Sequence, residues 1–167
     1  MGHFIHAMRR NANITYIVGN NTVYGLTKGQ ISPTAEKGTK SPSTPFGAPD
    51  PSINPLAVAL SVNCSFVARG YAGNLPHLSE LIRQGIEHEG FSFIDVLQPC
   101  VTYDKIHTYP YYQQKCYDLQ KEGHDASNRQ LAYEKAYETE RLPIGIFYQY
   151  QGEVYEKVQP QFANGPL

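Results

Sequence analysis

Two short apolar runs, residues 14–18 (ITYIV) and 91–97 (FSFIDVL), alternate along the chain with segments of helical periodicity. Runs of this length that are rich in β-branched and aromatic residues are typical of buried strands in a parallel sheet. The helical segments are residues 3–10, 55–62 and 76–88, and a further strand is expected at residues 65–69. This alternation predicts an α/β fold, with an open, mostly parallel sheet flanked by helices.

The composition bounds the class of protein. The chain has 167 residues, 41% hydrophobic and 17% charged, which suits one globular domain over residues 1–167. Its formal net charge of −1 gives no electrostatic reason to expect a nucleic-acid partner. No apolar run has the length of a membrane span, so we expect no membrane association.

Cysteine usage indicates the redox compartment. There are three cysteines, Cys64, Cys100 and Cys116, and none stands in a Cys-x-x-Cys pair. An odd number without pairing spacing argues against a disulfide framework, and the first residues carry no secretory leader pattern. We therefore expect a reducing, cytoplasmic location.

Polar residues follow both apolar runs at the point where each strand should end. Asn20 and Asn21 follow the first run, and Cys100 follows the second. Because ligands of open α/β sheets bind beyond the carboxyl ends of the strands, both positions are candidate site residues.

Amide oxygens suit Mg²⁺ or Ca²⁺ beside phosphate oxygens. The backbone N–H groups of Gly25, Leu26 and Thr27, with the Thr27 hydroxyl, form a segment that could cradle a phosphate. The alternative is a turn in which the asparagine side chains cap their own backbone.

The rest of the chain gives weaker signals. Residues 30–54 are rich in Pro, Ser, Thr, Gly and Lys and predict a long irregular loop, which in a compact domain is usually functional or disordered. Residues 103–167 predict an irregular, tyrosine-rich C-terminal extension with a short helix at 128–139. Residues 144–150 and 153–158 flank Gln151–Gly152 and suggest a hairpin or a terminal strand.

Several segments, taken in order, resemble the β subunit of the 2-oxoacid:ferredoxin oxidoreductases over nearly the whole chain. They are NNTVYGLTKGQISPT, STPFG, NPLAVAL, FVAR, HLSELIRQGIEHEGFSFIDVLQPCVTYD and LPIGIFYQ. The resemblance implies the diphosphate-binding domain of a thiamine-diphosphate fold. It implies oxidative decarboxylation of a 2-oxoacid, such as 2-oxoglutarate or pyruvate, to an acyl-coenzyme A. The implied partners are an α subunit, ferredoxin, coenzyme A and the 2-oxoacid, with electrons leaving through a [4Fe–4S] cluster.

The same resemblance assigns roles to residues of this sequence. Asn21 would bind Mg²⁺ through its side chain, and Val23 would bind it through its backbone carbonyl. The implied cofactor-binding residues are Asn20, Asn21, Val23, Tyr24, Gly25, Leu26 and Thr27. Leu26 and Lys28 would lie on the substrate and coenzyme A side. Cys100, within QPCVT, would be one of the four ligands of the iron–sulfur cluster.

Two parts of the family pattern do not occur in this sequence: the Gly-Asp-Gly element that supplies the Mg²⁺ carboxylate, and the other three cluster cysteines. Cys64 and Cys116 are not at matching positions. We therefore expect an N-terminally truncated portion of the subunit that is inactive by itself, with the cluster completed by residues outside this chain.

No residue of this chain is expected to be a catalytic acid or base. Asp95 is expected to be a satisfied structural carboxylate. His3 and His6 could reach the site from the first helix, and the other four histidines are expected at helix ends or on the surface.

Two other functions stay open. One is a domain of a different thiamine-diphosphate enzyme, which the cysteine of QPCVT argues against. The other is a non-catalytic remnant that only binds a partner subunit through its tyrosine-rich second half, which the missing Gly-Asp-Gly element favours for this chain alone.

Overall fold

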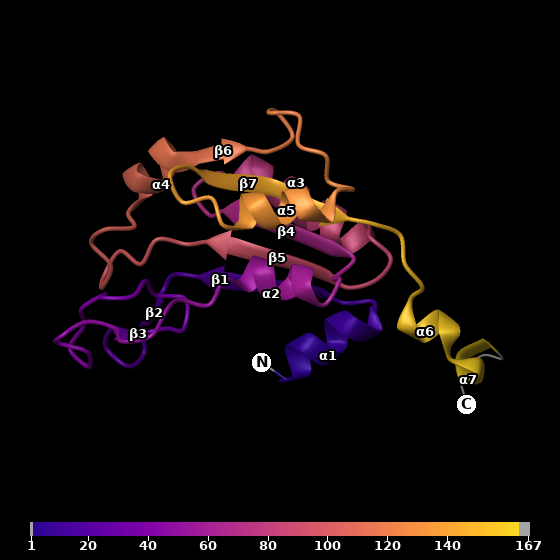
Figure 1. The fold of residues 1–167 in the computed structure, drawn as a ribbon, viewed down its shortest axis with the longest axis horizontal. Helices are drawn as coiled ribbons and strands as arrows, with labels where there is room; N and C mark the ends of the chain where they lie inside the picture. The colour runs from indigo at the N-terminus through magenta and orange to yellow at the C-terminus, as the bar shows by residue number, and fades with distance from the viewer. Residues whose placement is uncertain (1, 164–167) are drawn as a thin grey trace.

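The computed structural model describes residues 2–163 (Figure 1). The first half contains α1 (Gly2–Arg10), β1 (Thr15–Asn20), β2 (Val23–Tyr24), β3 (Gln30–Ile31), α2 (Pro55–Ser61), β4 (Phe66–Tyr71), α3 (Leu75–Glu87) and β5 (Ser92–Leu97). The second half contains α4 (Tyr109–Lys115), β6 (Cys116–Asp118), α5 (Arg129–Ala136), β7 (Leu142–Gln149), α6 (Tyr155–Val158) and α7 (Pro160–Ala163).

Local signals fix several helix starts. Asn54 caps α2, accepting the N–H of Ala57, and Pro55 occupies the first turn, as the sequence predicts. Asn128 caps α5 in the same way by accepting two backbone N–H groups. Such caps satisfy N–H groups that have no partner inside the helix.

Five strands form one sheet in the order β1-β5-β4-β7-β6. The pairs β1–β5, β5–β4 and β7–β6 are parallel, and only β7 against β4 is antiparallel. The expectation of an open, mostly parallel sheet flanked by helices is therefore confirmed. β2 and β3 form a separate two-stranded ribbon beyond the carboxyl end of β1 (Figure 1).

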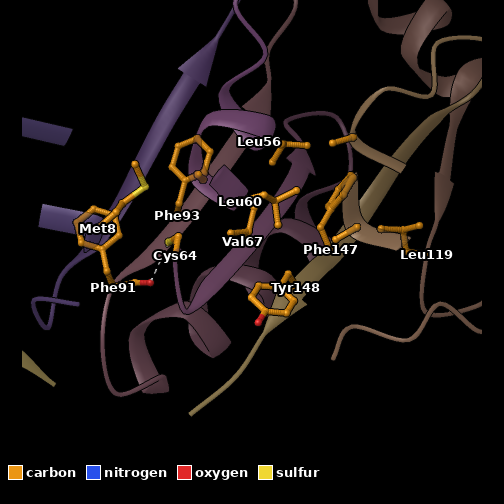
Figure 2. Close-up of a cluster of buried hydrophobic side chains, with 13 residues drawn as sticks. Met8, Leu56, Leu60, Cys64, Val67, Phe91, Phe93, Leu119, Phe147 and Tyr148 are labelled. Atoms are coloured by element: carbon orange, nitrogen blue, oxygen red, sulfur yellow. Dashed lines mark hydrogen bonds between the residues drawn. The ribbon is translucent and has the colours of Figure 1, made fainter. Parts of the chain in front are cut away.

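Helices cover both faces of the sheet. On one face, α1, α2 and α5 pack over the larger core, whose side chains include Met8, Leu60, Phe93 and Phe147 (Figure 2). On the other face, α3 packs over a smaller cluster around Leu81. Burial of these apolar side chains is the main favourable contribution to folding.

The prediction that residues 14–18 form a buried strand is wrong in its burial. β1 is an edge strand, and Tyr16 and Ile17 are 45% and 46% exposed. β5, which lies between β1 and β4, is buried throughout, as predicted. The difference follows from position in the sheet, because an edge strand has a neighbour on one side only.

Helices and strands occupy much of the C-terminal segment, residues 103–167, that was expected to be irregular. Residues 103–117 include α4, whose cap is the Thr108 side chain accepting the N–H of Tyr111. Residues 144–149 do belong to a strand, β7, but residues 153–158 contain the helix α6 and not the second strand of a hairpin. β7 runs instead between β4 and β6 in the main sheet, where its side chains are buried.

The loop after β3 lies at the same end of the molecule as β2 (Figure 1). It has no helix or strand between residues 32 and 54 except an isolated bridge between Ser41 and Thr44. Backbone hydrogen bonds nevertheless fold it on itself, from Gly38 N to Ala48 O and from Ala48 N to Thr39 O, both 2.9 Å.

His88 lies at a helix end, as expected, but its side chain is buried. It is the C-cap of α3, but it is only 8% exposed, and its Nε2 lies 2.8 Å from Ser65 Oγ. Burial lowers the pKa of this imidazole below its ordinary value. Among residues 2–163 no helix has the length and apolar character needed to cross a bilayer.

Candidate functional site

A cavity of about 470 Å³ opens where β1 ends at the carboxyl edge of the sheet. Four of the seven residues expected to bind the cofactor line it: Asn20, Asn21, Val23 and Tyr24. Its other walls come from α1, α2, β5 and the loop after β3, which are distant in sequence. A concave site at this edge is where open α/β sheets bind ligands.

The apolar wall of the cavity is aromatic. The ring of Phe4 lies 5.2 Å from that of Tyr16 and 5.1 Å from that of Phe93, and all three residues line the cavity. None of them was predicted to belong to the site. The helical spacing of apolar residues in α1 indicates that Phe4 packs inward, but not against what. His3 and His6, on the same helix, are exposed and do not line the cavity.

The other three expected cofactor-binding residues form the turn between β2 and β3. Lys28 N donates to Gly25 O at 3.1 Å, and the Thr27 hydroxyl donates to Tyr24 O at 3.3 Å. Leu26, at the tip, is 100% exposed, and the Lys28 side chain is exposed as well. The structure therefore separates these residues from the cavity wall formed by residues 20–24.

The turn carries three consecutive N–H groups that no atom of residues 2–163 accepts, those of Gly25, Leu26 and Thr27. A Cβ added at Gly25 would meet nothing within 4 Å, so the backbone is open to a close approach. Consecutive N–H donors without internal partners suit the oxygens of a phosphate or diphosphate. These donors fit the diphosphate expected from the sequence.

Asn21 combines a cavity position with a turn of its own. Its Oδ1 accepts the N–H of Val23 at 3.3 Å, which is the self-capping turn considered from the sequence. An amide oxygen has a second lone pair, so this bond leaves one for another partner. Within the described residues no Asp or Glu side chain lines the cavity, so they offer Mg²⁺ neutral oxygens only.

The Asn20 amide is occupied at both ends. Its Nδ2 donates to Asp95 Oδ1 at 3.1 Å, and its Oδ1 accepts the Thr34 hydroxyl at 2.7 Å. Asp95 is fully buried and its other oxygen accepts Arg69 Nε at 3.1 Å, which confirms the expectation of a satisfied structural carboxylate.

The two polar strand ends do lie together. β1 and β5 are paired up to Asn20 and Leu97, and Gln98 N then donates to Asn20 O at 3.0 Å. Farther out, the Thr22 hydroxyl donates to Asp104 Oδ2 at 3.3 Å. The loop after β5 is thereby tied to the loop after β1.

Gly19 also belongs to this junction. A Cβ at this position would come within 2.7 Å of Gln98 Oε1. A larger side chain at this position would make the flexible end of the Gln98 side chain move.

Cys100 is half-buried in the loop after β5, and its backbone carbonyl accepts the N–H of Asp104. Cys64 is buried in the core, and Cys116 begins β6. Residues 2–163 contain no group of three or more His, Cys, Asp and Glu side chains able to hold a metal ion. A [4Fe–4S] cluster, which needs four ligands, therefore does not fit these residues by themselves, and Cys100 could supply one ligand only.

Comparison with known proteins identifies the domain. Residues 1–96 match the family described as "Thiamine pyrophosphate enzyme, C-terminal TPP binding domain". This match covers more than half of the chain. The chain belongs to the thiamine pyrophosphate enzymes. Residues 100–164 of this thiamine pyrophosphate enzyme chain match a second family, described as the C-terminal part of the pyruvate ferredoxin oxidoreductase β subunit.

Curated relatives of this thiamine pyrophosphate enzyme chain are β subunits of 2-oxoacid:ferredoxin oxidoreductases. The subunit from Saccharolobus solfataricus is 42% identical over 99% of this chain and 60% of its own length. The subunit from a Sulfolobus species is 44% identical over 89% of this chain and 52% of its own length. The chain thus spans roughly half to three fifths of the length of these relatives.

A solved structure has the same fold. It is the 2-oxoglutarate:ferredoxin oxidoreductase from Magnetococcus marinus with 2-oxoglutarate, coenzyme A and succinyl-CoA bound. It superposes with a TM-score of 0.87 at 35% identity, over 92% of this chain and 53% of that chain.

Proposed function

We propose that this chain is the thiamine-diphosphate-binding part of the β subunit of a 2-oxoacid:ferredoxin oxidoreductase. The enzyme would decarboxylate a 2-oxoacid of the 2-oxoglutarate or pyruvate type, transfer the acyl group to coenzyme A and reduce ferredoxin. The observation that carries the proposal is the cavity at Asn20 and Asn21, whose wall ends at Tyr24, directly before the turn whose N–H groups at residues 25–27 have no acceptor among residues 2–163. Membership of the thiamine pyrophosphate enzymes supports it.

Several residues of the site have a proposed role in holding the cofactor. The N–H groups of Gly25, Leu26 and Thr27 would bind the diphosphate, and the aromatic wall around Phe4 would border the organic part of the cofactor. Asn21 Oδ1 and the Val23 carbonyl would each give Mg²⁺ a neutral oxygen. When bound, thiamine diphosphate supplies the carbanion that attacks the keto carbon of the substrate.

Leu26, Lys28 and Cys100 are proposed to contact groups other than thiamine diphosphate. Leu26 and Lys28 would face substrate and coenzyme A, because both are exposed at the outer end of the turn. Cys100 would be one ligand of a [4Fe–4S] cluster whose other ligands are not among residues 2–163. The three free thiols suit a reducing, cytoplasmic location.

Partner subunits are part of the proposal. Leu26, in the turn between β2 and β3, is 100% exposed, and Phe46, in the loop after β3, is 99% exposed. Large apolar side chains that are fully exposed suit contact with another chain. An α subunit that covers this edge, and ferredoxin as the electron acceptor, are the partners we propose.

Calorimetric titration with thiamine diphosphate in the presence of Mg²⁺ tests the function. Asn21→Ala removes a ligand oxygen, so we expect the Kd of the oxidoreductase complex for the cofactor to rise about tenfold or more. Asn13→Ala is the matched control, because Asn13 is exposed and its Oδ1 likewise accepts one backbone N–H, that of Gly90. The Kd of the control should not change. Absence of binding by the wild-type complex would favour the partner-binding remnant instead.

A further inference from the structure

A buried charged side chain of the sheet, Asp95, is hydrogen-bonded to Asn20, the last residue of β1. Val18, Asp95 and Arg69 stand side by side on β1, β5 and β4, as the register of the strands places them. Successive side chains of a strand alternate between the two faces, so Asn20 lies on the same face as Val18. Asn20 and Asp95 are thus neighbours on the face that also carries Phe93 and the cavity.

The carboxylate of Asp95 is 0% exposed, and each of its oxygens has a donor. Arg69 Nε donates to Oδ2 and Asn20 Nδ2 donates to Oδ1, each at 3.1 Å. Arg69 is itself 8% exposed, and its guanidinium carbon lies 5.6 Å from the centre of the Phe147 ring. A carboxylate this deeply buried needs its donors, so the pair holds the Asn20 amide firmly.

The charge also decides which way the amide points. An ionised carboxylate only accepts hydrogen bonds, so it selects the NH₂ end of Asn20 and turns the oxygen toward Thr34. The Thr34 hydroxyl donates to this oxygen at 2.7 Å and lies 2.8 Å from Ser32 Oγ. Asn20, Thr34 and Ser32 all line the cavity. A continuous series of hydrogen bonds therefore runs from Asp95 in the interior of the sheet to Thr34 and Ser32 in the wall of the cavity.

We propose that Asp95, held by Arg69, is a positioning residue for the cofactor site. It fixes Asn20 in one orientation, and through Asn20 it holds the loop at Ser32–Thr34 and the backbone that presents Asn21. This inference rests on the proposed function and goes beyond it, because Asp95 touches neither the cavity nor its contents. Its effect is to pre-organise the wall that the cofactor meets, so that binding does not have to order it.

The test measures the Kd of the oxidoreductase complex for thiamine diphosphate with Mg²⁺, together with the thermal unfolding temperature of each variant. Asp95→Asn keeps the shape and removes the charge that orients Asn20, so the Kd should rise at least about tenfold. Thr34→Val removes both hydrogen bonds of the Thr34 hydroxyl, to Asn20 Oδ1 and to Ser32 Oγ, and the Kd should rise about fivefold with an unchanged unfolding temperature. Thr34→Ser keeps the hydroxyl and should restore the wild-type Kd.

The double variant Asp95→Asn/Thr34→Val separates positioning from a general loss of stability. If both residues act through Asn20, the Kd of the double variant equals that of Asp95→Asn alone. Independent effects, in which the two increases multiply, would overturn the proposal. Should Asp95→Asn not fold, the Thr34 variants decide, and an unchanged Kd in Thr34→Val overturns it.

The outcome also distinguishes this inference from the proposed function. A wild-type complex that does not bind thiamine diphosphate would refute both. A wild-type complex that binds, with variants that bind equally well, would refute the positioning role and leave the proposed function intact.

Discussion

Gly29 lies against the ring of Tyr103 so closely that an added Cβ would be 2.8 Å from Cδ1 and 3.3 Å from Cβ of the tyrosine. Gly29 closes the turn between β2 and β3, and Tyr103 belongs to the loop after β5. This contact is one of those that join the two loops at the carboxyl end of the sheet. The conformation of the turn that carries the free N–H groups therefore depends on contact with a residue 74 positions farther along the chain.

Gly29→Ala should destabilise the chain for two reasons. Its φ of +87° is unfavourable for an L residue, and the new methyl group meets Tyr103 near the backbone, where rotation of the ring gives little relief. We expect a loss of about 3 kcal/mol in the free energy of unfolding, measured by urea denaturation. Gly38→Ala is the control, because Gly38 has a φ of +86° with nothing within 4 Å, and it should lose about 1 kcal/mol. Equal losses would show that the contact with Tyr103 contributes nothing.

His88 should make the stability depend on pH. Burial lowers its pKa in the folded protein, so the unfolded chain binds this proton more readily. The contribution of His88 to the free energy of unfolding is therefore fully present above the ordinary histidine pKa of 6.5. It is lost as the pH falls from 6.5 to the lower pKa of the folded state. Glu89, which raises this pKa slightly, does not reverse the direction.

Thermal unfolding between pH 5 and pH 8 measures the effect. As the pH falls below about 6.5, the unfolding temperature of the wild type should decrease, and His88→Gln should make this decrease smaller. His77→Gln is the comparison variant, because burial also lowers the pKa of His77 and the same argument predicts a pH dependence from it. An unaltered slope in His88→Gln would assign the pH dependence to His77 or to other groups.

The cysteines should differ in reactivity. Burial raises the pKa of Cys64 to about 12 and that of Cys116 to about 11, so neither thiol ionises appreciably near pH 8. An alkylating reagent at this pH should leave Cys64 and Cys116 unmodified until urea unfolds the chain, with Cys100 reacting first. Peptide mass spectrometry after timed quenching identifies the modified residue. Early modification of Cys64 would mean that the core around Phe91 and Phe93 opens readily.

Lys28 offers a test of the coenzyme A side of the site. Its φ of +59° is tolerated best by Asn and Gly, so Lys28→Asn removes the charge with little backbone strain. If Lys28 faces a phosphate of coenzyme A, the KM for coenzyme A should rise about threefold to tenfold while kcat is unchanged. Steady-state assays of the oxidoreductase complex measure both constants. Lys37→Asn, an exposed lysine of the neighbouring loop, is the control, and an equal effect there would indicate a general loss of positive charge.

Local sequence patterns were enough to predict the features that depend on a few neighbouring residues. The Asn54 cap with Pro55, the buried strand at residues 91–97 and the exit of β1 at Asn20–Asn21 are all patterns of this kind. Caps and periodicity involve hydrogen bonds and side-chain spacing within one or two turns, so they can be read without knowledge of the fold. The position of the candidate site followed from them, because parallel strands end at a common edge.

What those residues meet depends on how the whole chain packs. The insertion of β7 between β4 and β6, the exposure of β1 and the partner of Asn20 in Asp95 depend on which strands become neighbours. The contact of Gly29 with Tyr103 and the aromatic wall around Phe4 join segments that are far apart in the chain. Such pairings are fixed by packing of the entire core, and local sequence patterns are compatible with many of them.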